Sequence, residues 1–251
     1  ALDATGTAVL NADDARVVGM ADGRGVDVVT YGESPAATVH LMDITVDDRA
    51  HPTAKVVTPW GDLEVTVPVA GRHNAWNAAA AIAVAGVLGV DMSAAVAGIS
   101  EAAVSRWRGE VVDVAGIRFL NDAYNANPVA MRAALETLDT LATGRRVAVL
   151  GVMAEIGPRH DAEHHAVGTS VPEHADQLVV VGEEAEAIAI GAEDAGMAVD
   201  AIHAVATTDA ALAVLADLLV PGDTVLVKAS RVGGLERIVT GWQERTGAAP
   251  A

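Results

Sequence analysis

The chain has 251 residues, of which 51% are hydrophobic and only 3% aromatic, so its cores must be built mainly from aliphatic side chains. A formal net charge of −18, without any stripe of basic residues, argues against a nucleic acid held through its phosphates. The absence of cysteine excludes disulfides, thiolate catalysis and zinc–thiolate sites. No apolar run reaches the ~18 residues that span a bilayer, and no signal pattern opens the chain, so a cytoplasmic protein without membrane insertion is expected.

Residues 1–70 are predicted to be rich in β-strands. Apolar and polar residues alternate over residues 38–46, 54–58 and 63–69, which indicates half-buried antiparallel strands. Two further strands are expected at residues 7–13 and 26–31, and Gly61-Asp62 suits a hairpin turn. The chain opens on Ala1-Leu2 with almost no lead-in, which is typical of a cut through a domain.

Residues 73–103 are predicted to be helical. An alanine-rich helix is expected at residues 74–88 with apolar residues on most faces, so it should be well buried. Gly89 ends it, and Asp91 caps a second, short helix that reaches residue 103. A polar break follows at residues 105–109, and it predicts two domains, residues 1–105 and 106–251.

Residues 110–251 alternate regularly between strands and helices. The predicted strands are residues 111–114, 117–120, 146–150, 178–181, 201–205 and 224–227. The predicted helices are residues 129–141, 162–171, 184–195, 208–219 and 235–245. Buried strands in this order predict an α/β domain with a mostly parallel, doubly wound sheet.

The stretch Asn121-Asp-Ala-Tyr-Asn-Ala-Asn-Pro128 carries the strongest functional signal. A strand delivers Asp122 to its carboxyl end, and the crevice outside such ends is where open α/β sheets bind ligands. Asn127-Pro128 fits the N-cap and first residue of the next helix. An Asx turn together with this N-cap would explain the polar side chains of the stretch equally well, without any function. Because Asn127 already supplies the cap, Asp122 has no local structural task, which favours a functional one.

A second cluster of polar residues lies at the start of the first long predicted helix. His73, Asn74 and Asn77 are spaced so that they can share one helical face, where amides could bind an adenine edge or a phosphate oxygen. The structural alternative is that Asn74 is simply an N-cap. Asn77 lies within an alanine helix, and a buried amide there would need hydrogen-bond partners.

Basic residues gather at two further points. Arg106 and Arg108 flank Trp107 at the predicted boundary, and a guanidinium suits a phosphate or carboxylate, although a solvated linker arginine is at least as good an explanation. Lys228-Ala-Ser-Arg231 follows the last strand, just before a helix, which makes a good anion site. A salt bridge to an acidic residue is the alternative. Either way, Lys228 should lie at the same sheet edge as Asp122.

The stretch Gly151-Val-Met-Ala-Glu-Ile-Gly157 also follows a strand. It lacks the glycine spacing of a dinucleotide fingerprint and leaves Glu155 in a strand-end loop. His160 and His164 are one helical turn apart and could bind a metal, but no third ligand is evident. A solvated helix face is therefore favoured for the histidines, including His165, and no metal site is predicted.

Together these motifs resemble the Mur ligases of peptidoglycan synthesis, most closely the MurF type. The matching strings, in family order, are Val9-Leu-Asn-Ala-Asp-Asp14, Gly71-x-His-Asn-x-x-Asn77, Arg106-Trp-Arg108, Asn121-Asp-Ala-Tyr-Asn-Ala-Asn-Pro128, Met153-Ala-Glu-Ile-Gly157 and Val227-Lys-Ala-Ser-Arg231. The resemblance implies part of a central ATP-binding α/β domain followed by a Rossmann-like C-terminal domain. The family's phosphate-binding loop is absent, and its magnesium ligands are expected upstream of Ala1. Val152 stands where the family usually carries an acid.

The resemblance also implies an activity. The complete enzyme would use ATP and Mg²⁺ to activate UDP-N-acetylmuramoyl-tripeptide as an acyl phosphate, which the amine of D-alanyl-D-alanine then attacks. This chain would be a monomeric fragment, inactive alone. The alternatives are a non-catalytic Rossmann-like nucleotide-binding module and a ligase similar to folylpolyglutamate synthetase.

Site residues follow from the same resemblance. Those assigned to the nucleotide are His73, Asn74, Asn77, Asp122, Tyr124 and Asn125. Within this set, Asn74 and Asn77 would contact the adenine region and Asp122 the ribose. Those assigned to the incoming substrate are Asn127, Ser230 and Arg231. The catalytic residues would be Arg108, or Arg106 in its place, beside the γ-phosphate and Lys228 beside the acyl phosphate.

Overall fold

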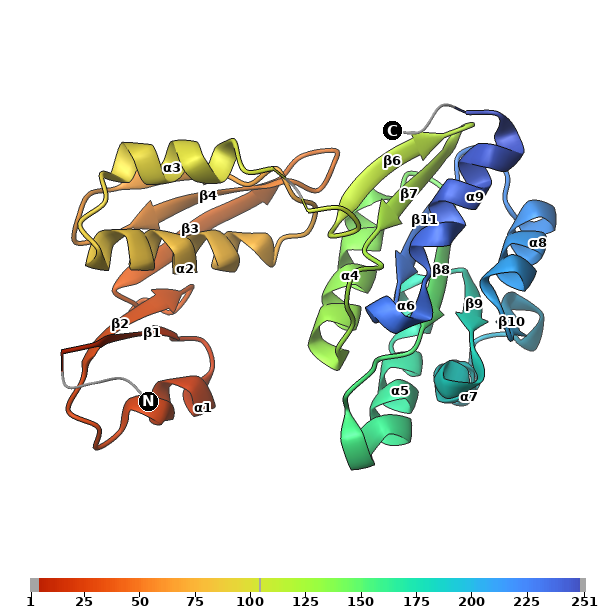
Figure 1. Cartoon of the computed structure of the whole chain (residues 1–251), viewed down its shortest axis with the longest axis horizontal. Helices are drawn as coiled ribbons and strands as arrows, with labels where there is room; N and C mark the ends of the chain where they lie inside the picture. The colour runs from red at the N-terminus through yellow and green to blue at the C-terminus, as the bar shows by residue number, and fades with distance from the viewer. Residues whose placement is uncertain (1–4, 104, 249–251) are drawn as a thin grey trace. The chain divides into compact units, whose positions relative to one another are not determined.

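The computed structural model describes residues 5–103 and 105–248, and the chain divides into two units, Ala1–Ala103 and Val104–Ala251, each described here by itself (Figure 1). This division lies two residues before the boundary expected from the polar break. The proposed cut at Ala1-Leu2 falls outside the described residues.

The first unit is built on a five-stranded sheet in the order β1-β2-β3-β4-β5. Its strands are β1 (Thr7–Asn11), β2 (Asp27–Gly32), β3 (Val39–Val46), β4 (Pro52–Val57) and β5 (Leu63–Thr66). β1, β2 and β3 run parallel, whereas β3, β4 and β5 are antiparallel, which confirms the direction that alternation predicted for the last three.

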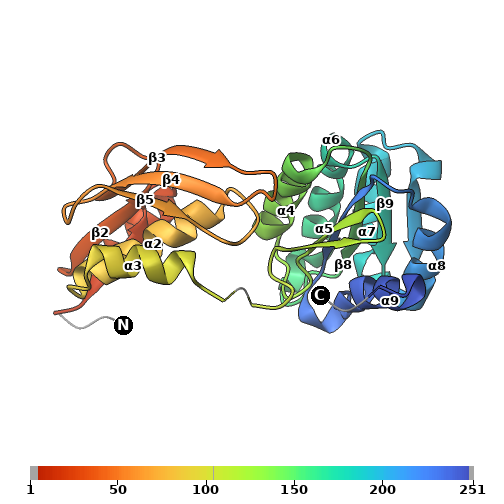
Figure 2. The ribbon, with the colours of Figure 1, turned by 90° about the horizontal axis from the view of Figure 1, so that it is seen from above.

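Two helices cover this sheet, as Figure 2 shows: α2 (Asn74–Val87) and α3 (Met92–Ser100). The short α1 (Ala15–Val18) and η1 (Gly19–Ala21) follow β1. α2 buries one stripe, including Ala79 and Ile82, in the aliphatic core, while Asn77 and Val84 on its other side are exposed. The expectation of burial on most faces was therefore wrong, because alanine makes a helix apolar without requiring that every face be covered.

The second unit contains a six-stranded sheet in the order β10-β9-β8-β11-β7-β6. Its strands are β6 (Glu110–Val114), β7 (Ile117–Asn121), β8 (Arg146–Gly151), β9 (Gln177–Val181), β10 (Ile202–Val205) and β11 (Thr224–Lys228). All neighbours are parallel except β6 and β7, so the carboxyl ends of β7 to β11 meet at one edge.

Helices cover both faces of this sheet (Figure 1). They are α4 (Pro128–Leu141), α5 (His160–Gly168), α6 (Val171–His174), α7 (Glu186–Asp194), α8 (Thr208–Leu218) and α9 (Glu236–Thr246), with short η2 (Gly157–Arg159), η3 (Glu183–Ala185), η4 (Val199–Ala201) and η5 (Arg231–Gly233). α8 and α9 pack through Leu215 and Ile238 onto the face formed by Val149, Val179 and Val227. The predicted aliphatic, doubly wound core is confirmed.

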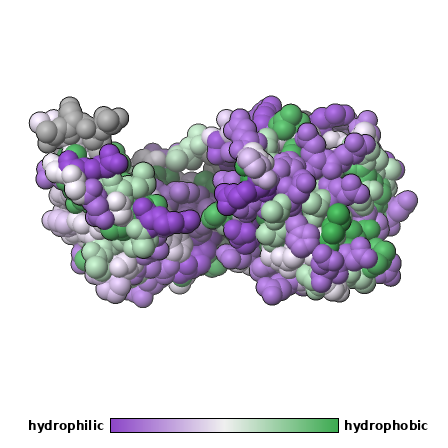
Figure 3. Space-filling model, turned by 90° about the horizontal axis from the view of Figure 1, so that it is seen from below, coloured by the Kyte–Doolittle hydropathy of each residue, from purple (hydrophilic) through white to green (hydrophobic). Residues whose placement is uncertain are grey.

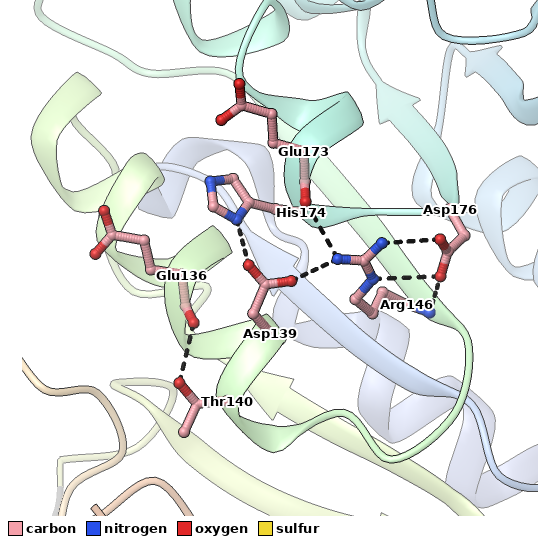
Figure 4. Close-up of polar contacts among 7 residues, drawn as sticks. All are labelled: Glu136, Asp139, Thr140, Arg146, Glu173, His174 and Asp176. Carbon is pink, nitrogen blue, oxygen red and sulfur yellow. Dashed lines mark hydrogen bonds and ion pairs between the residues drawn. The ribbon is translucent and has the colours of Figure 1, made fainter. Parts of the chain in front are cut away.

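The amino-terminal edge of the same sheet carries an ionic network (Figure 4). The guanidinium of Arg146, at the start of β8, donates to both carboxylate oxygens of Asp176, at 2.9 and 3.3 Å, and to Asp139 on α4 at 2.6 Å. His174 of α6 contacts the other oxygen of Asp139. The hydrogen bonds from Arg146 hold the pKa of Asp176 below its usual range. This network joins α4, α6, β8 and the residue that precedes β9 at the edge opposite the predicted site, which indicates a structural role.

Hydrophilic residues dominate the face seen in Figure 3, in keeping with the net charge of −18. None of the helices among the described residues combines the length and apolar character needed to cross a membrane.

Candidate active site

An ion pair between Asp122 and Lys228 lies at the carboxyl edge of the second sheet. Lys228 ends β11, Asp122 follows β7, and these strands are neighbours, so the expected shared edge is confirmed. The Lys228 side chain is 2% exposed. Its ammonium donates to a carboxylate oxygen of Asp122, to the Asn125 carbonyl at 2.9 Å and, more weakly, to the Asp122 carbonyl at 3.5 Å. An ammonium has three protons to donate, so these acceptors favour a positioning role over direct contact with substrate.

The other carboxylate oxygen of Asp122 holds the segment that enters the unit. It accepts a hydrogen bond from the Gly109 amide at 3.1 Å, and the Tyr124 amide donates to the Trp107 carbonyl at 3.0 Å. Trp107 adopts a left-handed φ of 63°, which is uncommon for a bulky residue and must be held by its surroundings. Asp122 therefore links the entry segment, β7 and β11 at one point.

Two arginines stack on aromatic rings beside this point. The Arg108 guanidinium lies 3.8 Å from the Tyr124 ring centroid, and that of Arg231 lies 4.1 Å from the Trp107 centroid. Both arginines are exposed, and Arg231 also pairs with Glu236 at 3.2 Å. Stacking fixes the plane of a guanidinium while its N–H edge stays able to bind an anion. Arg106 is also exposed.

Ser230 and Asn127 are engaged within the protein. Ser230 is 3% exposed; its hydroxyl accepts from the Ala154 amide at 2.9 Å and donates to the Ala126 carbonyl at 3.3 Å. Asn127 accepts from the Ala130 amide at 2.9 Å, which confirms it as the N-cap of α4, with Pro128 as the first helical residue. These side chains hold the loops around Asp122, whereas Tyr124 and Asn125 expose their side chains.

The amides of the first unit pair with one another at the start of α2. Asn77 donates to the side-chain oxygen of Asn74 at 2.9 Å, and Asn74 donates to the Ala70 carbonyl at 2.9 Å, so the shared face is confirmed for these two asparagines. The N-cap is His73, not Asn74, and it makes no side-chain cap. Asn77 is exposed, so the argument from a buried amide was wrong.

Asp13 is a residue to which the sequence argument gave no role. Its carboxylate accepts from the amides of Glu33 and Ser34 at 2.9 and 2.8 Å and from the Trp76 indole at 2.7 Å. Burial opposes ionisation of Asp13, but these hydrogen bonds outweigh it and lower the pKa. A Cβ on Gly32 would meet this carboxylate at 2.5 Å, so the glycine is required. Asp13 lies two residues after the end of β1, in a stretch that was expected to be strand, and its place in the loop after a strand was the signal.

His164 contradicts the expectation of a solvated histidine face. Its side chain is fully buried; Nε2 accepts from the Met153 amide at 2.8 Å, and Nδ1 donates to the His160 carbonyl at 2.7 Å. His165 does lie at the surface, where it contacts Asp194 at 2.8 Å. Among the described residues, no group of three or more acidic, histidine or cysteine side chains could hold a metal ion.

A pocket of about 440 Å³ opens at the carboxyl ends of β8 to β11, beyond the Asp122–Lys228 pair. Acidic residues Glu183 and Glu184 line it, together with Arg237 and the first residues of α8. Arg237 pairs with Asp209 at 3.1 Å, and both side chains are largely exposed. Val152, which replaces the acid usual in the family, forms part of the pocket wall. The pocket therefore presents both signs of charge to a ligand.

Comparison with known proteins gives this fold and site a family. The Mur ligase middle domain matches residues 1–85, and the domain described as "Mur ligase, glutamate ligase domain" matches residues 107–231. The chain belongs to the Mur ligase family, and the predicted α/β fold class, with a Rossmann-like C-terminal domain preceded by part of the central domain, is confirmed.

Several relatives of the chain carry the name of the same member of that family. The chain is 38% identical over 253 residues to UDP-N-acetylmuramoyl-tripeptide–D-alanyl-D-alanine ligase of Mycobacterium tuberculosis strain CDC 1551, covering 92% of this chain and 49% of the relative. A crystal structure of MurF from Acinetobacter baumannii superposes with a TM-score of 0.84 at 29% identity, over 96% of this chain and 52% of that one. MurF ligase of Thermotoga maritima, solved with ADP, gives a TM-score of 0.80 at 22% identity, over 98% and 55%, and shares the fold. The chain spans about half the length of the curated relatives it matches.

Proposed function

We propose that this chain is part of an ATP-dependent ligase that joins D-alanyl-D-alanine to UDP-N-acetylmuramoyl-tripeptide in cytoplasmic peptidoglycan synthesis. The observation that carries the proposal is the Asp122–Lys228 ion pair, whose members come from two of the matching family strings and meet at the sheet edge where α/β folds bind ligands. The name of the M. tuberculosis relative, at 38% identity, supports the substrates.

The proposed reaction has two steps. A carboxylate oxygen of the tripeptide attacks the γ-phosphorus of ATP, so that an acyl phosphate forms and ADP leaves. The dipeptide amine then attacks the acyl carbon, and a tetrahedral intermediate collapses to the amide with loss of phosphate and a proton. Cations must neutralise the transferring phosphoryl group, and the amine must be held near the acyl carbon.

The exposed arginines suit the phosphate task. Arg108 and Arg231 are held by aromatic stacking, and they would bind phosphoryl oxygens through their N–H edges. Asp122 retains acceptor capacity for a ribose hydroxyl, since a carboxylate has about four lone-pair sites and Lys228 and Gly109 use two. Asn74 and Asn77 remain our candidates for the adenine, and the ADP in the T. maritima structure supports a nucleotide in this family.

The described residues do not offer a magnesium site, since no group of three suitable ligands occurs among them. Mg²⁺ therefore enters the proposal only through the family resemblance, and no step here is assigned to it.

The pocket beside β8 to β11 suits the incoming dipeptide. D-alanyl-D-alanine is a small zwitterion, so an ammonium can meet Glu183 or Glu184 while a carboxylate meets Arg237. The exposed pair of Arg237 with Asp209 costs little to rearrange, because surface ion pairs contribute only about 0–1 kcal/mol.

Calorimetry on the chain tests the site assignments. We expect D-alanyl-D-alanine to bind, and Arg237→Ala to weaken it at least tenfold, while Arg159→Ala, an exposed arginine paired with Glu163, leaves it unchanged. Dipeptide binding that is insensitive to Arg237→Ala would contradict the assignment of the pocket.

Phosphate release tests the activity in a longer protein that contains this chain. Release should require ATP, the UDP-tripeptide and the dipeptide together, and it should fall at least a hundredfold in Arg108→Ala. ATP binding to the chain without any phosphate release in the longer protein would instead indicate a nucleotide-binding module.

A further inference from the structure

The loop after β8 is a motif that the proposed function does not use. Glu155 has a left-handed φ of 63°, and Gly157 follows at 69°. A non-glycine residue in this conformation persists only when its surroundings impose it. Contacts from the surrounding residues must therefore hold residues 153–155 in place.

Two buried side chains hold the amides that precede Glu155. His164 accepts from the Met153 amide at 2.8 Å, and Ser230 accepts from the Ala154 amide at 2.9 Å. Ser230 also donates its own backbone N–H to the Val152 carbonyl at 2.8 Å. Since Val152 lines the pocket, the same contacts fix part of the pocket wall.

Only one protonation state of His164 fits these contacts. Nδ1 faces the His160 carbonyl, which can only accept, and Nε2 faces the Met153 amide, which can only donate. The ring must therefore be neutral with its proton on Nδ1. An imidazolium would place a second N–H against the Met153 N–H, so the hydrogen bond would be lost.

The surroundings favour this neutral ring at pH 7. Burial lowers the pKa of His164, the hydrogen bond to the His160 carbonyl raises it, and the His160 imidazole, 4.0 Å away between centroids, lowers it. Asp161 and Glu184 favour the charged form but do not reverse the direction. The other charged side chains nearby are Glu163 on α5 itself and those on the helices packed against it: Arg159 of η2, Arg132, Glu136 and Asp139 of α4, and Glu186, Glu193 and Asp194 of α7.

We propose that His164 is a positioning residue that acts as a pH-sensitive latch: its neutral ring holds residues 152–155 against the sheet edge, and its protonation releases them. The latch is closed above the ordinary imidazole value of about 6.5 and weakens as pH falls from there through the lowered pKa of the folded state. The inference does not depend on which ligand the pocket binds.

Nuclear magnetic resonance on the whole chain between pH 8 and pH 5 tests the latch. At pH 8 the nitrogen chemical shifts of the His164 ring should show that Nδ1 carries the proton and that Nε2 is unprotonated. As pH falls below about 6.5, protection of the Met153 amide from exchange should drop by up to tenfold per pH unit. The Val152 methyl signals should shift at the lower pH at which the His164 ring of the folded protein takes up its proton.

Two variants sharpen this test. His164→Phe should lose Met153 protection at every pH, whereas His165→Gln, on the exposed side of the same helix, should behave as wild type. If His164→Phe does not fold, the wild-type titration decides alone. A proton on Nε2 at pH 8, or Met153 protection that stays constant while His164 titrates, would overturn the proposal.

Discussion

The Asp122–Lys228 pair makes a quantitative prediction. Lys228→Met removes the ammonium but keeps a similar side-chain volume. It leaves the Asn125 carbonyl without this donor and the Asp122 carboxylate with only the Gly109 amide. Removing one member of a buried ion pair costs about 3–5 kcal/mol. Because the Asp122 side chain is 24% exposed and can recruit water, we expect a cost of about 3 kcal/mol, at the lower end of that range.

Asp122→Asn should be more damaging than Lys228→Met. It leaves an ammonium that is 2% exposed with only neutral acceptors, so we expect a cost of about 5 kcal/mol. The double variant contains no buried charge and should be no less stable than Asp122→Asn. The two substitutions should therefore couple by at least about 3 kcal/mol.

Native-state hydrogen exchange of β7 and β11 amides is the suitable assay, because it measures the opening of the second unit alone. Arg159→Met provides the control within the same unit: Arg159 contacts Glu163 at 3.0 Å, but its side chain is 78% exposed, so the change should cost less than about 1 kcal/mol. Additive effects of the Asp122 and Lys228 substitutions, within about 0.5 kcal/mol, would refute the reasoning.

Three further predictions concern stability. Gly191→Ala should cost about 1–3 kcal/mol in urea unfolding because its Cβ would lie 2.1 Å from a carbonyl oxygen of α5, whereas Gly98→Ala, with nothing within 4 Å, should be neutral or stabilising. Asp176→Asn should make the free energy of unfolding depend less steeply on pH at acid pH. Because Arg146 lowers the pKa of Asp176, the wild type loses this stabilisation as pH falls from about 3.9, the unfolded pKa, through the lower pKa of the folded state. An unchanged slope would contradict this. Asn127→Ala should cost about 1 kcal/mol through loss of the α4 cap, measured as a lower urea midpoint, and Asn127→Gly should cost less.

The strand boundaries of the second unit were predicted to within a residue or so for β7 and β11, because these strands are short, buried aliphatic runs bounded by polar loops. β11 was expected at residues 224–227 and ends at Lys228, and β7 was expected at 117–120 and ends at Asn121. The shared edge of Asp122 and Lys228 followed from parallel pairing, since carboxyl ends of parallel strands must meet. Residue pattern could not show that the ammonium would be enclosed by its acceptors, because that depends on how the following loops fold back.

The misjudged residues show where periodicity should have been used more strictly. His164 lies three and four residues before Val167 and Gly168, which are both fully or nearly buried, so helical spacing alone placed it on the inner face of α5. Asn77 was assigned to a buried face because its neighbours are alanines, but alanine is common at the surface and gives little information about burial. Amphipathic spacing predicts orientation, whereas local composition does not.

The site divides its polar residues into two groups by exposure. Lys228, Ser230 and His164 are buried, and their donors and acceptors are taken up by the protein, so their effect on a ligand must pass through the loops they hold. Arg108 and Arg231 are exposed and held mainly by stacking, which leaves their N–H edges able to reach an anion. Substitution in the first group should change stability and ligand affinity together, because a loosened loop misplaces every contact it carries. Substitution of Arg108 should change affinity while the fold keeps its stability, since its stacking partner Tyr124 is itself exposed and carries no charge to be compensated. Substitution of Arg231 should also cost some stability, because it removes the partner of Glu236, whose side chain is only 17% exposed.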